Sequence, residues 1–454
     1  MTAASDAPPV KVENRDLRRA IAASGIGNAV EWFDYGIYAY GTVYIAKALF
    51  PADSASAVLF TLLGFAISFL MRPLGGLVWG PLGDKIGRKA VLSMTILLMG
   101  GATVCVGLIP SYTTIGIAAP IILYLLRIIQ GFSTGGEYGG AATFMAEYAP
   151  EKRRGFFGSF LEVGTLVGFN GGALLMLGLI AFTTEDQMAS WGWRIPFFVA
   201  GPLGLIGLYL RNKIEDTPIF QELEAKEETS TSARATLGEL FSKHMKTLLI
   251  LSGMVIALNV VNYTLLTYSP TYLQEVINLS QDNALIVPII GQFIMMLLLP
   301  LFGALSDRVG RKPLWYVSLI GLIVLAIPMY KLMGTSEAGA IIGFAVLGLL
   351  YAPQLATISA TFPAMFPTPV RYAGLALGYN VATSLFGGTA GFANQALIDS
   401  TGDKLWPAYY MMIACAVGLV ATFFLIETKG MSLRGTHQPG TPQAIAEQKE
   451  LSRA

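Results

Sequence analysis

Long apolar runs alternate with short polar segments along almost the whole chain. Each run has about 20 residues or more, the length that an α-helix needs to cross the hydrocarbon core of a bilayer. Twelve such runs can be delimited, at 21–47, 57–82, 90–109, 114–143, 155–181, 194–211, 247–273, 284–305, 313–333, 338–362, 371–397 and 405–426. The pattern therefore predicts an all-α membrane protein with 12 transmembrane helices.

The longest polar stretch divides the chain into two halves. Residues 212–246, rich in Glu, Ser, Thr and Lys, follow the sixth apolar run. They separate a predicted N-terminal six-helix bundle, 20–211, from a predicted C-terminal one, 247–428. Beyond these lie a polar N-terminal segment, 1–19, and a tail, 429–454, whose glycines and prolines predict disorder.

Basic residues concentrate in every second polar segment. If the N-terminus is inside, the inside segments hold 24 of the 30 Lys and Arg residues. Four lie in the outer segments or at the adjoining ends of apolar runs, and only Arg72 and Arg127 remain in the interior of the runs. Because basic loops stay on the cytoplasmic side, we expect a multi-pass protein of the cell membrane with both termini and the central loop in the cytoplasm. We identify no cleavable signal peptide at the N-terminus.

Composition supports the membrane assignment and excludes several other classes. Only 13% of residues are charged and 54% are hydrophobic, whereas soluble proteins carry about 25% charged residues. A net charge of +1 argues against a nucleic-acid partner. The chain has two cysteines, which lie in apolar runs and are expected to be buried, so a disulfide framework is excluded. Its two histidines lie in polar stretches, which excludes a zinc site and a Ser-His-Asp triad. We therefore expect no cofactor and no enzyme chemistry.

The two halves repeat a loop motif. Gly80–Lys89 and Gly303–Lys312 both read G-x-x-x-D-x-x-G-R-K, and both follow the second apolar run of their half. Further along, Pro150–Gly155 is echoed by Pro367–Arg371. Signals that recur in the same order indicate two related six-helix units.

This pair of loops in a 6+6 chain resembles the major facilitator superfamily. More narrowly, the segments 27–34, 72–76 and 130–138 resemble the metabolite:proton symporters of that superfamily. Segments 107–112, 191–197 and 363–367 are most similar to the symporters of osmoprotectants. The resemblance implies a monomeric secondary transporter that takes up a small zwitterion, such as proline or glycine betaine, with a proton by alternating access. Proton-coupled transport of a dicarboxylate, tricarboxylate or keto acid, such as 2-oxoglutarate or citrate, is the alternative.

The resemblance also implies a cytoplasmic gate built from the repeated loops. An Asp there can accept hydrogen bonds from a helix N-terminus or from an Arg across the bundle. In the family such clusters tie helices together and break during the transport cycle. A simple anchor of positive charge at the inner surface is the other interpretation. The candidate gate residues are Gly83, Asp84, Gly87, Arg88, Lys89, Glu147, Arg154, Asp307, Gly310, Arg311, Lys312 and Arg371.

Ionisable residues inside apolar runs are costly and point to function. Counting 1.5 Å per residue from Arg19 places Glu31 and Asp34 about 18 and 23 Å deep. Arg72 lies about 18 Å from Asp84 on the second helix, a depth at which it could pair with the first helix. We predict that Asp34 carries the coupled proton, with Glu31 and Glu137 as rivals and Arg72 as the neighbouring charge. A permanent ion pair of Asp34 or Glu31 with Arg72 is the alternative.

Substrate ligands are predicted mainly on the first helix of each half. Aromatic faces suit a quaternary ammonium group, and amides suit a polar substrate at the interface between halves. A guanidinium can bind both carboxylate oxygens, which makes Arg127 a candidate anchor. Packing and helix cross-bonding are the structural alternatives, and for Glu162 we favour such a role. The candidate ligands are Asn28, Trp32, Tyr35, Tyr38, Arg127, Asn259, Asn262, Tyr263, Gln354 and Asn380, and Gln292 also lies on a helix of the second half.

Glycines spaced four residues apart predict close helix contacts. The repeats are Gly135-x3-Gly139, Gly136-x3-Gly140, Gly164-x3-Gly168-x3-Gly172 and Gly374-x3-Gly378.

Overall fold

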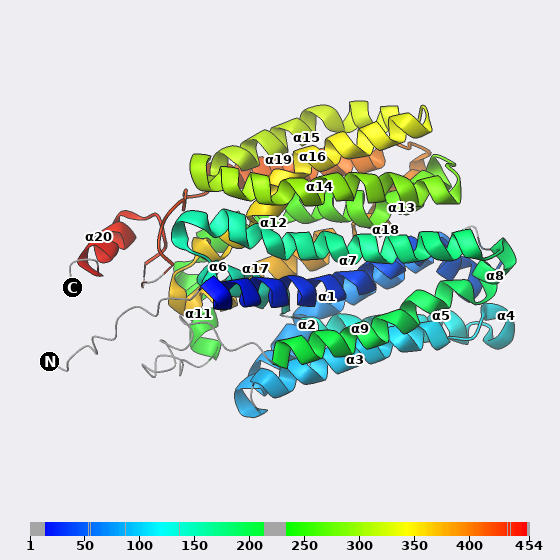
Figure 1. Ribbon diagram of the computed structural model, residues 1–454, viewed down its shortest axis with the longest axis horizontal. Coiled ribbons are helices and arrows are strands. Elements are labelled where there is room, and N and C mark those ends of the chain that lie inside the picture. Colours follow the sequence, from blue (N-terminus) through cyan, green and yellow to red (C-terminus); the bar gives the residue numbers. More distant parts are fainter. Residues whose placement is uncertain are drawn as a thin grey trace.

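The computed structural model describes residues 14–451 except 53, 55, 87, 136, 213–232, 434 and 436. Its long helices run side by side along the longest axis of the molecule (Figure 1). The N-terminal half contains α1 (Asn14–Leu49), α2 (Ala57–Ile86), α3 (Arg88–Leu108), α4 (Tyr112–Ile115), α5 (Ala118–Ser133), α6 (Glu137–Tyr148), η1 (Glu151–Arg153), α7 (Arg154–Phe182), α8 (Glu185–Ser190), η2 (Gly192–Arg194) and α9 (Ile195–Asn212).

The C-terminal half contains more interrupted helices. Its elements are α12 (Met245–Asn262), η3 (Tyr263–Tyr268), α13 (Ser269–Thr271), η4 (Tyr272–Val276), α14 (Gln281–Val309), α15 (Arg311–Met333), α16 (Glu337–Thr361), η5 (Pro363–Met365), α17 (Thr368–Ala382), η6 (Thr383–Gly387), α18 (Ala390–Thr401) and α19 (Trp406–Phe424). The helices α11 (Ala233–Lys243) and α20 (Pro442–Leu451) lie at the end of the bundle where α1 begins, which we call the terminal end (Figure 1).

Joining the segments that continue one another gives 12 long helical spans within the described residues, as predicted. These are α1, α2, α3, α5–α6, α7, α9, α12–η4, α14, α15, α16, α17–α18 and α19. Seven of them are also long and apolar enough to cross a membrane by hydropathy. The span α1 has a lower mean hydropathy because its first turns hold Arg15, Asp16, Arg18 and Arg19, and Glu31 and Asp34 lie further along it.

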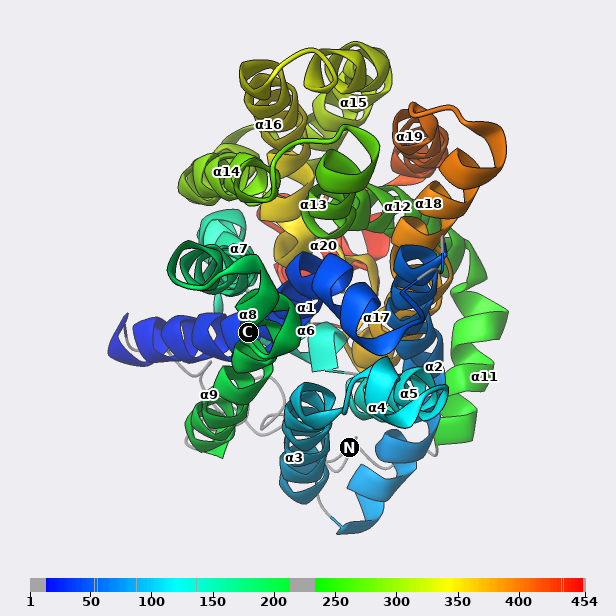
Figure 2. The same cartoon turned by 90° about the vertical axis from the view of Figure 1, so that its right-hand side faces the viewer.

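The two halves form separate helix groups that meet along a long interface (Figures 1 and 2). Helix α7 packs against α14 and α16, while α2 contacts α18 and η6. Gly155 on α7 and Gly303 on α14 approach so closely that a Cβ atom on either would clash with the backbone of the other. Small residues therefore bring the halves into direct contact near the terminal end.

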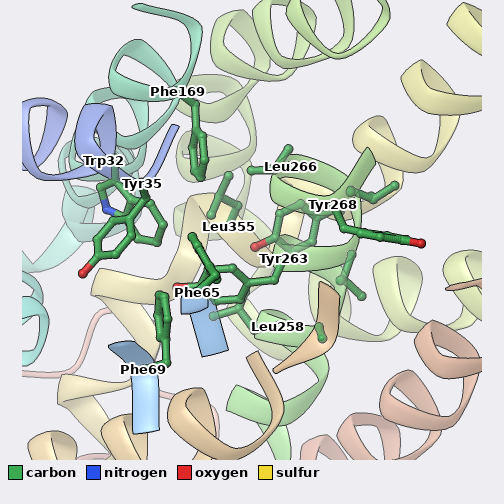
Figure 3. Close-up of a cluster of buried hydrophobic side chains, with 14 of the residues drawn as sticks. Trp32, Tyr35, Phe65, Phe69, Phe169, Leu258, Tyr263, Leu266, Tyr268 and Leu355 are labelled. Atoms are coloured by element: carbon green, nitrogen blue, oxygen red, sulfur yellow. The ribbon is translucent and has the colours of Figure 1, made fainter. Parts of the chain in front are cut away.

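Three π-helical segments interrupt the C-terminal half. They are η3 and η4, which continue α12, and η6, which continues α17. Wider turns of this kind often occur at functional sites because they redirect side chains. The segment η3 begins at Tyr263, which faces the N-terminal half (Figure 3).

The glycine repeat of α7 packs against α1, as predicted. A Cβ atom on Gly164 would clash with Gly25, and one on Gly168 would clash with the Ala29 carbonyl. A Cβ atom on Gly172 would lie 3.1 Å from the Ile37 backbone nitrogen, a tight contact but a looser one. The side chain positions of residues 136–141 lie outside the description, so the repeats that include Gly136, Gly139 and Gly140 are only partly covered.

The structure differs from expectation at the tail and at one cysteine. Residues 437–451 include helix α20, and Leu433 is buried with Ala146 and Ala364 instead of lying in a disordered segment. Burial of this apolar side chain explains the order. Cys415 is buried as expected, whereas Cys105 is exposed, because α3 lies at the periphery of the bundle.

We expect Gly168→Val to destabilise the N-terminal half, because the new side chain overpacks the contact between α7 and α1. The cost should be about 1–3 kcal/mol. Gly178→Val on the same helix is the matched control, since a Cβ atom there meets no atom within 4 Å. Thermal unfolding of the detergent-purified protein should show a lower midpoint for Gly168→Val alone. Equal midpoints for both variants would contradict the tight crossing.

Candidate transport site and gate

Six aromatic side chains meet where the two halves face each other (Figure 3). Each ring has a neighbour whose centroid lies 5.0 to 6.2 Å away, the usual range for interacting aromatic pairs. The rings come from α1, α2, α7 and η3, so both halves contribute. We call this group the ring cluster: Trp32, Tyr35, Phe65, Phe69, Phe169 and Tyr263.

Arg72 borders the ring cluster from α2. Its guanidinium lies 4.0 Å from the centroid of Phe69 and 5.0 Å from that of Tyr35, and it donates a hydrogen bond to the Tyr35 hydroxyl. The Glu31 charge adds a favourable electrostatic interaction. Arg72 therefore does reach the first helix, as its depth predicted, but through a tyrosine and aromatic faces.

Phe65 and Phe69 are site residues that sequence reasoning missed. Phe65, Phe69 and Arg72 follow i, i+4, i+7 spacing, which places them on one face of α2. The arginine on that face was the available signal, since a face that holds a buried cation cannot point at lipid.

A second polar group lies inside the N-terminal half and contains Asp34 and Arg127. Arg127 is fully buried against the Tyr38 ring, 4.1 Å from its centroid, and donates a 2.7 Å hydrogen bond to Gln130. Gln130 in turn donates to Thr103 at 2.7 Å and, more weakly, to Asp34 at 3.4 Å. The amide thus links the carboxylate of α1 to the guanidinium of α5.

Asn28 joins α1 to α7, where its partner Thr165 also binds Glu162. The Asn28 amide donates to the Leu161 carbonyl at 2.8 Å and to Thr165 at 2.7 Å, and it accepts from Trp32. Thr165 donates to Glu162 at 3.0 Å. Glu162 thus has the structural contact that we favoured, and Asn28 is also occupied in holding two helices together and positioning Trp32.

Most of the amides in the C-terminal half connect helices of that half. Asn259 donates to Thr383 at 2.9 Å, and Gln354 donates to Ser318 at 2.7 Å. Asn262 accepts from Tyr351 at 3.1 Å, and Asn380 is buried on α17. Gln292 is different, because it donates to the Tyr40 hydroxyl of α1 at 2.8 Å and so joins the halves.

Asp307 forms the main contact between halves at the terminal end. Its two carboxylate oxygens each accept a 2.9 Å hydrogen bond, from the backbone N–H groups of Gly155 and Phe156. These are first-turn amides of α7, where the helix dipole favours an anion. Arg311 also binds Asp307, at 2.8 Å. One loop motif therefore latches the C-terminal half onto a helix N-terminus of the other half.

A buried ion pair adds to this latch. Arg371 of α17 lies 3.1 Å from Glu147 of α6, and both side chains are buried. The Nε atoms of Arg371 and Arg154 donate to the carbonyls of Pro363 and Ala146, each eight residues earlier. This matched bonding supports the sequence repeat.

The tail joins the same contacts at the terminal end. Arg154 donates to the Met431 carbonyl at 2.9 Å, and Arg371 donates to the Leu433 carbonyl.

The first loop motif is only partly described. Gly83 and Asp84 end α2, and Arg88 and Lys89 begin α3, but their side chains lie outside the description, as do Gly87 and the Glu137 side chain. In the second motif, Gly310 has φ of 104°, a conformation that favours glycine, and it allows the turn between α14 and α15. The Lys312 N–H donates to Glu427 at 3.0 Å. Among the described residues no cluster of three His, Cys, Asp or Glu side chains could hold a metal ion.

Comparison with known proteins identifies the family. Residues 20–438 match the family model described as "Sugar (and other) transporter". The chain belongs to this family of major facilitator transporters. Proline/betaine transporters of Salmonella typhimurium and Escherichia coli K12 are each 42% identical to it over 450 residues, which cover 97% of this chain and 89% of theirs. The glycine betaine/proline/ectoine/pipecolic acid transporter OusA of Dickeya dadantii is 40% identical over 450 residues, with the same coverage.

Solved structures of major facilitator transporters share the fold. The proton:xylose symporter XylE bound to 6-bromo-6-deoxy-D-glucose superposes with a TM-score of 0.73 at 18% identity, covering 94% of this chain and 99% of XylE. An inward-open form of XylE from E. coli gives 0.68 at 20% identity, covering 92% and 98%. The protein is thus a multi-pass membrane transporter and not an enzyme, as predicted.

We expect Asp307→Ala to open the terminal end, because the α7 amides lose a charged acceptor. Such bonds contribute about 1.5–3 kcal/mol, which corresponds to a population shift of about tenfold or more. The reporter is a cysteine at Ser159, which is fully buried near Gly303. Cys105 and Cys415 are replaced by serine, so that a water-soluble thiol reagent labels only the new cysteine. The labelling rate should rise in Asp307→Ala by the same factor as the open population.

Glu427→Ala is the control for the latch. This variant also removes a carboxylate that accepts from the first turn of a helix, but the contact lies within one half. Labelling at Ser159→Cys should stay at its original rate in Glu427→Ala. If both variants accelerate labelling equally, the contact between Asp307 and α7 does not hold the halves closed.

Proposed function

We propose that the protein is a proton-coupled symporter of a small zwitterionic osmoprotectant, such as proline or glycine betaine, with its terminal end in the cytoplasm. The ring cluster with Arg72, formed between the halves, is the observation that carries this proposal. The names of the relatives at 40–42% identity point to the same substrates.

The chemistry of the ring cluster suits both ends of such a molecule. A quaternary ammonium group has no N–H to donate, so aromatic faces are its natural partner. A guanidinium binds a carboxylate through two parallel hydrogen bonds. Arg72 and the rings of Tyr35, Phe69 and Tyr263 therefore supply the two required surfaces side by side, since Phe69 lies 4.0 Å from the guanidinium and 5.4 and 5.0 Å from the other two ring centroids.

A dicarboxylate or tricarboxylate substrate would require a second cation at the same place. Arg127 was the candidate for that role. It lies behind Tyr38, bound to Gln130, within the N-terminal half. Among the described residues, Arg72 contacts Tyr35 and Phe69. Arg127 approaches the ring cluster at Phe65, 5.4 Å from its centroid, but its guanidinium is already bound to Gln130, which favours a substrate with one carboxylate.

Asp34 is our proton carrier, in preference to Glu31 and Glu137. It is buried, and it faces Arg127 through Gln130. Protonation would remove a charge from the membrane interior and release its attraction to Arg127. Trp32 and Tyr35 are on the same helix, so a shift of α1 would move two side chains of the ring cluster. Proton and substrate can thus be coupled through one helix.

Alternating access would use contacts on both sides of the ring cluster. Toward the terminal end, Asp307 latches onto α7, and Arg371 pairs with Glu147. Toward the other end, Tyr40 accepts from Gln292 across the interface. We propose that the two sets break alternately, so that the substrate meets one side of the membrane at a time.

For the substrate, we expect Tyr263→Leu to weaken glycine betaine transport, because an aromatic face for the ammonium is lost. A cation–π contact of about 0.5–2 kcal/mol corresponds to a KM increase of about 2- to 30-fold. Tyr263→Phe keeps the ring and should keep the KM. The measurement is counterflow in proteoliposomes with labelled glycine betaine, proline, 2-oxoglutarate and citrate. Counterflow of the last two alone would reject the proposed substrate class.

For coupling, Asp34→Asn should abolish substrate accumulation driven by an acid-outside pH gradient, because the amide does not titrate. Substrate exchange without a gradient should persist, since it needs no proton release. Uptake into proteoliposomes with and without the gradient separates the two. Full gradient-driven accumulation in Asp34→Asn would remove Asp34 from the coupling role, and Glu31→Gln and Glu137→Gln would then be measured in the same way.

A further inference from the structure

A cavity inside the N-terminal half reaches Asp34 from a direction away from the ring cluster. It lies between α1, α3 and α9, helices that run beside one another (Figure 1), and has a volume of about 50 Å³. About 10–15 Å³ of such volume suffices for one water molecule, so the cavity has room for several. Its lining includes Val30, Glu31, Asp34, Gly100, Gly204 and Gly207.

Asp34 lines this cavity with a buried carboxylate oxygen that has no hydrogen-bond donor among the described residues. Its side chain is buried, with 4% of its surface exposed, and its Oδ1 atom has no hydrogen-bond partner among the described residues. Buried carboxylate oxygens are rarely left without a donor, and a water molecule in the adjoining cavity can supply one. The polar and charged groups that face Asp34 are Glu31 and Tyr35 on α1, Thr103 on α3, and Arg127 and Gln130 on α5. Helix α9 contributes only the uncharged residues Ala200, Gly204 and Gly207 to the cavity lining.

The cavity extends from Asp34 toward the terminal end. Gly27 also lines it, about 10 Å nearer that end along α1. Gly207 lies only about 8 Å from the terminal end of α9. Several lining residues, including Val30, Gly100 and Gly204, are partly exposed on the side of the bundle, so the helices do not fully enclose the cavity.

We propose that this cavity is the route by which Asp34 exchanges its proton with the cytoplasm, separate from the path of the substrate between the halves. The inference rests on the proposed role of Asp34 in coupling. In the release step the carboxyl O–H bond breaks, and the proton passes to a cavity water, which hands it to the aqueous phase as the carboxylate forms. The substrate can then leave between the halves while the proton leaves through the N-terminal half.

The glycines keep this route open. A Cβ atom on Gly100 would meet no atom within 4 Å, and one on Gly207 would make an ordinary contact with Val30 at 3.6 Å. Larger side chains at these positions would therefore occupy the cavity without clashing with the backbone. Gly101, the next residue of α3, also has nothing within 4 Å but is exposed on the outer surface of that helix.

The test compares Gly100→Leu with Gly101→Leu in proteoliposomes. Leucine at position 100 displaces water next to Asp34, whereas leucine at position 101 faces outward. Gradient-driven uptake of glycine betaine should fall by about tenfold or more in Gly100→Leu, since losing a positioned proton acceptor commonly costs at least that factor. Counterflow of labelled glycine betaine should stay at the wild-type rate, and Gly101→Leu should resemble the wild type in both assays.

The outcomes distinguish a failure of the proton route from a failure of proton coupling itself. Equal gradient-driven uptake in Gly100→Leu, Gly101→Leu and the wild type would overturn the proton route and leave the symport intact. A parallel loss of uptake and counterflow in Gly100→Leu would also overturn it, because the cavity would then serve packing or substrate movement. Absence of gradient-driven uptake in the wild type would instead reject proton coupling itself.

Discussion

Charge buried at mid-depth is the constraint on which this structure depends. A lone guanidinium or carboxylate inside a membrane bundle is costly, so each needs partners from other helices. Arg72 rests on the Tyr35 hydroxyl and on aromatic faces, while Arg127 and Asp34 share Gln130. These contacts hold α1, α2 and α5 together. They also give α1 two chemically different sides, because Asp34 faces the interior of one half and Tyr35, the next residue, faces the ring cluster.

Contacts between the halves follow a different physical rule. At the terminal end, an acidic side chain meets the positive end of a helix dipole, and small residues permit close approach. Beside the packing of α7 against α14 and α16, the closed arrangement at the terminal end thus includes a few directional bonds, such as those from α7 to Asp307. In the proposed transport cycle, interactions of this kind can break and re-form, whereas the extensive packing of α7 on α1 would keep the N-terminal half rigid.

The fold was largely predictable from the sequence, and the site only in part. Helix length and loop repeats depend on local pattern, so the 12 spans could be located in advance, and so could Asp307, Glu147 and Arg371, which form contacts between the halves. Helical spacing identifies a face but not the side chains that it meets, which is why the contact of Arg72 with the Tyr35 hydroxyl was not foreseen and Gln354 was given a substrate role that its bond to Ser318 does not favour. Apolar residues in an apolar helix carry little information, so Phe65 and Phe69 were missed. The contacts of the tail involve one buried leucine within a polar segment and backbone carbonyls that accept from Arg154 and Arg371, which the local pattern does not reveal.

The most direct test of the account is the number of protons that the purified transporter takes up when it binds substrate. A pH indicator in a weakly buffered detergent solution reports this number when glycine betaine is added. If substrate binding at the ring cluster is coupled to Asp34, the wild type takes up about one proton per substrate molecule over the pH range where the carboxyl titrates. Asp34→Asn should bind glycine betaine without proton uptake. Equal uptake in both proteins, or binding by the wild type without any uptake, would contradict coupling through Asp34.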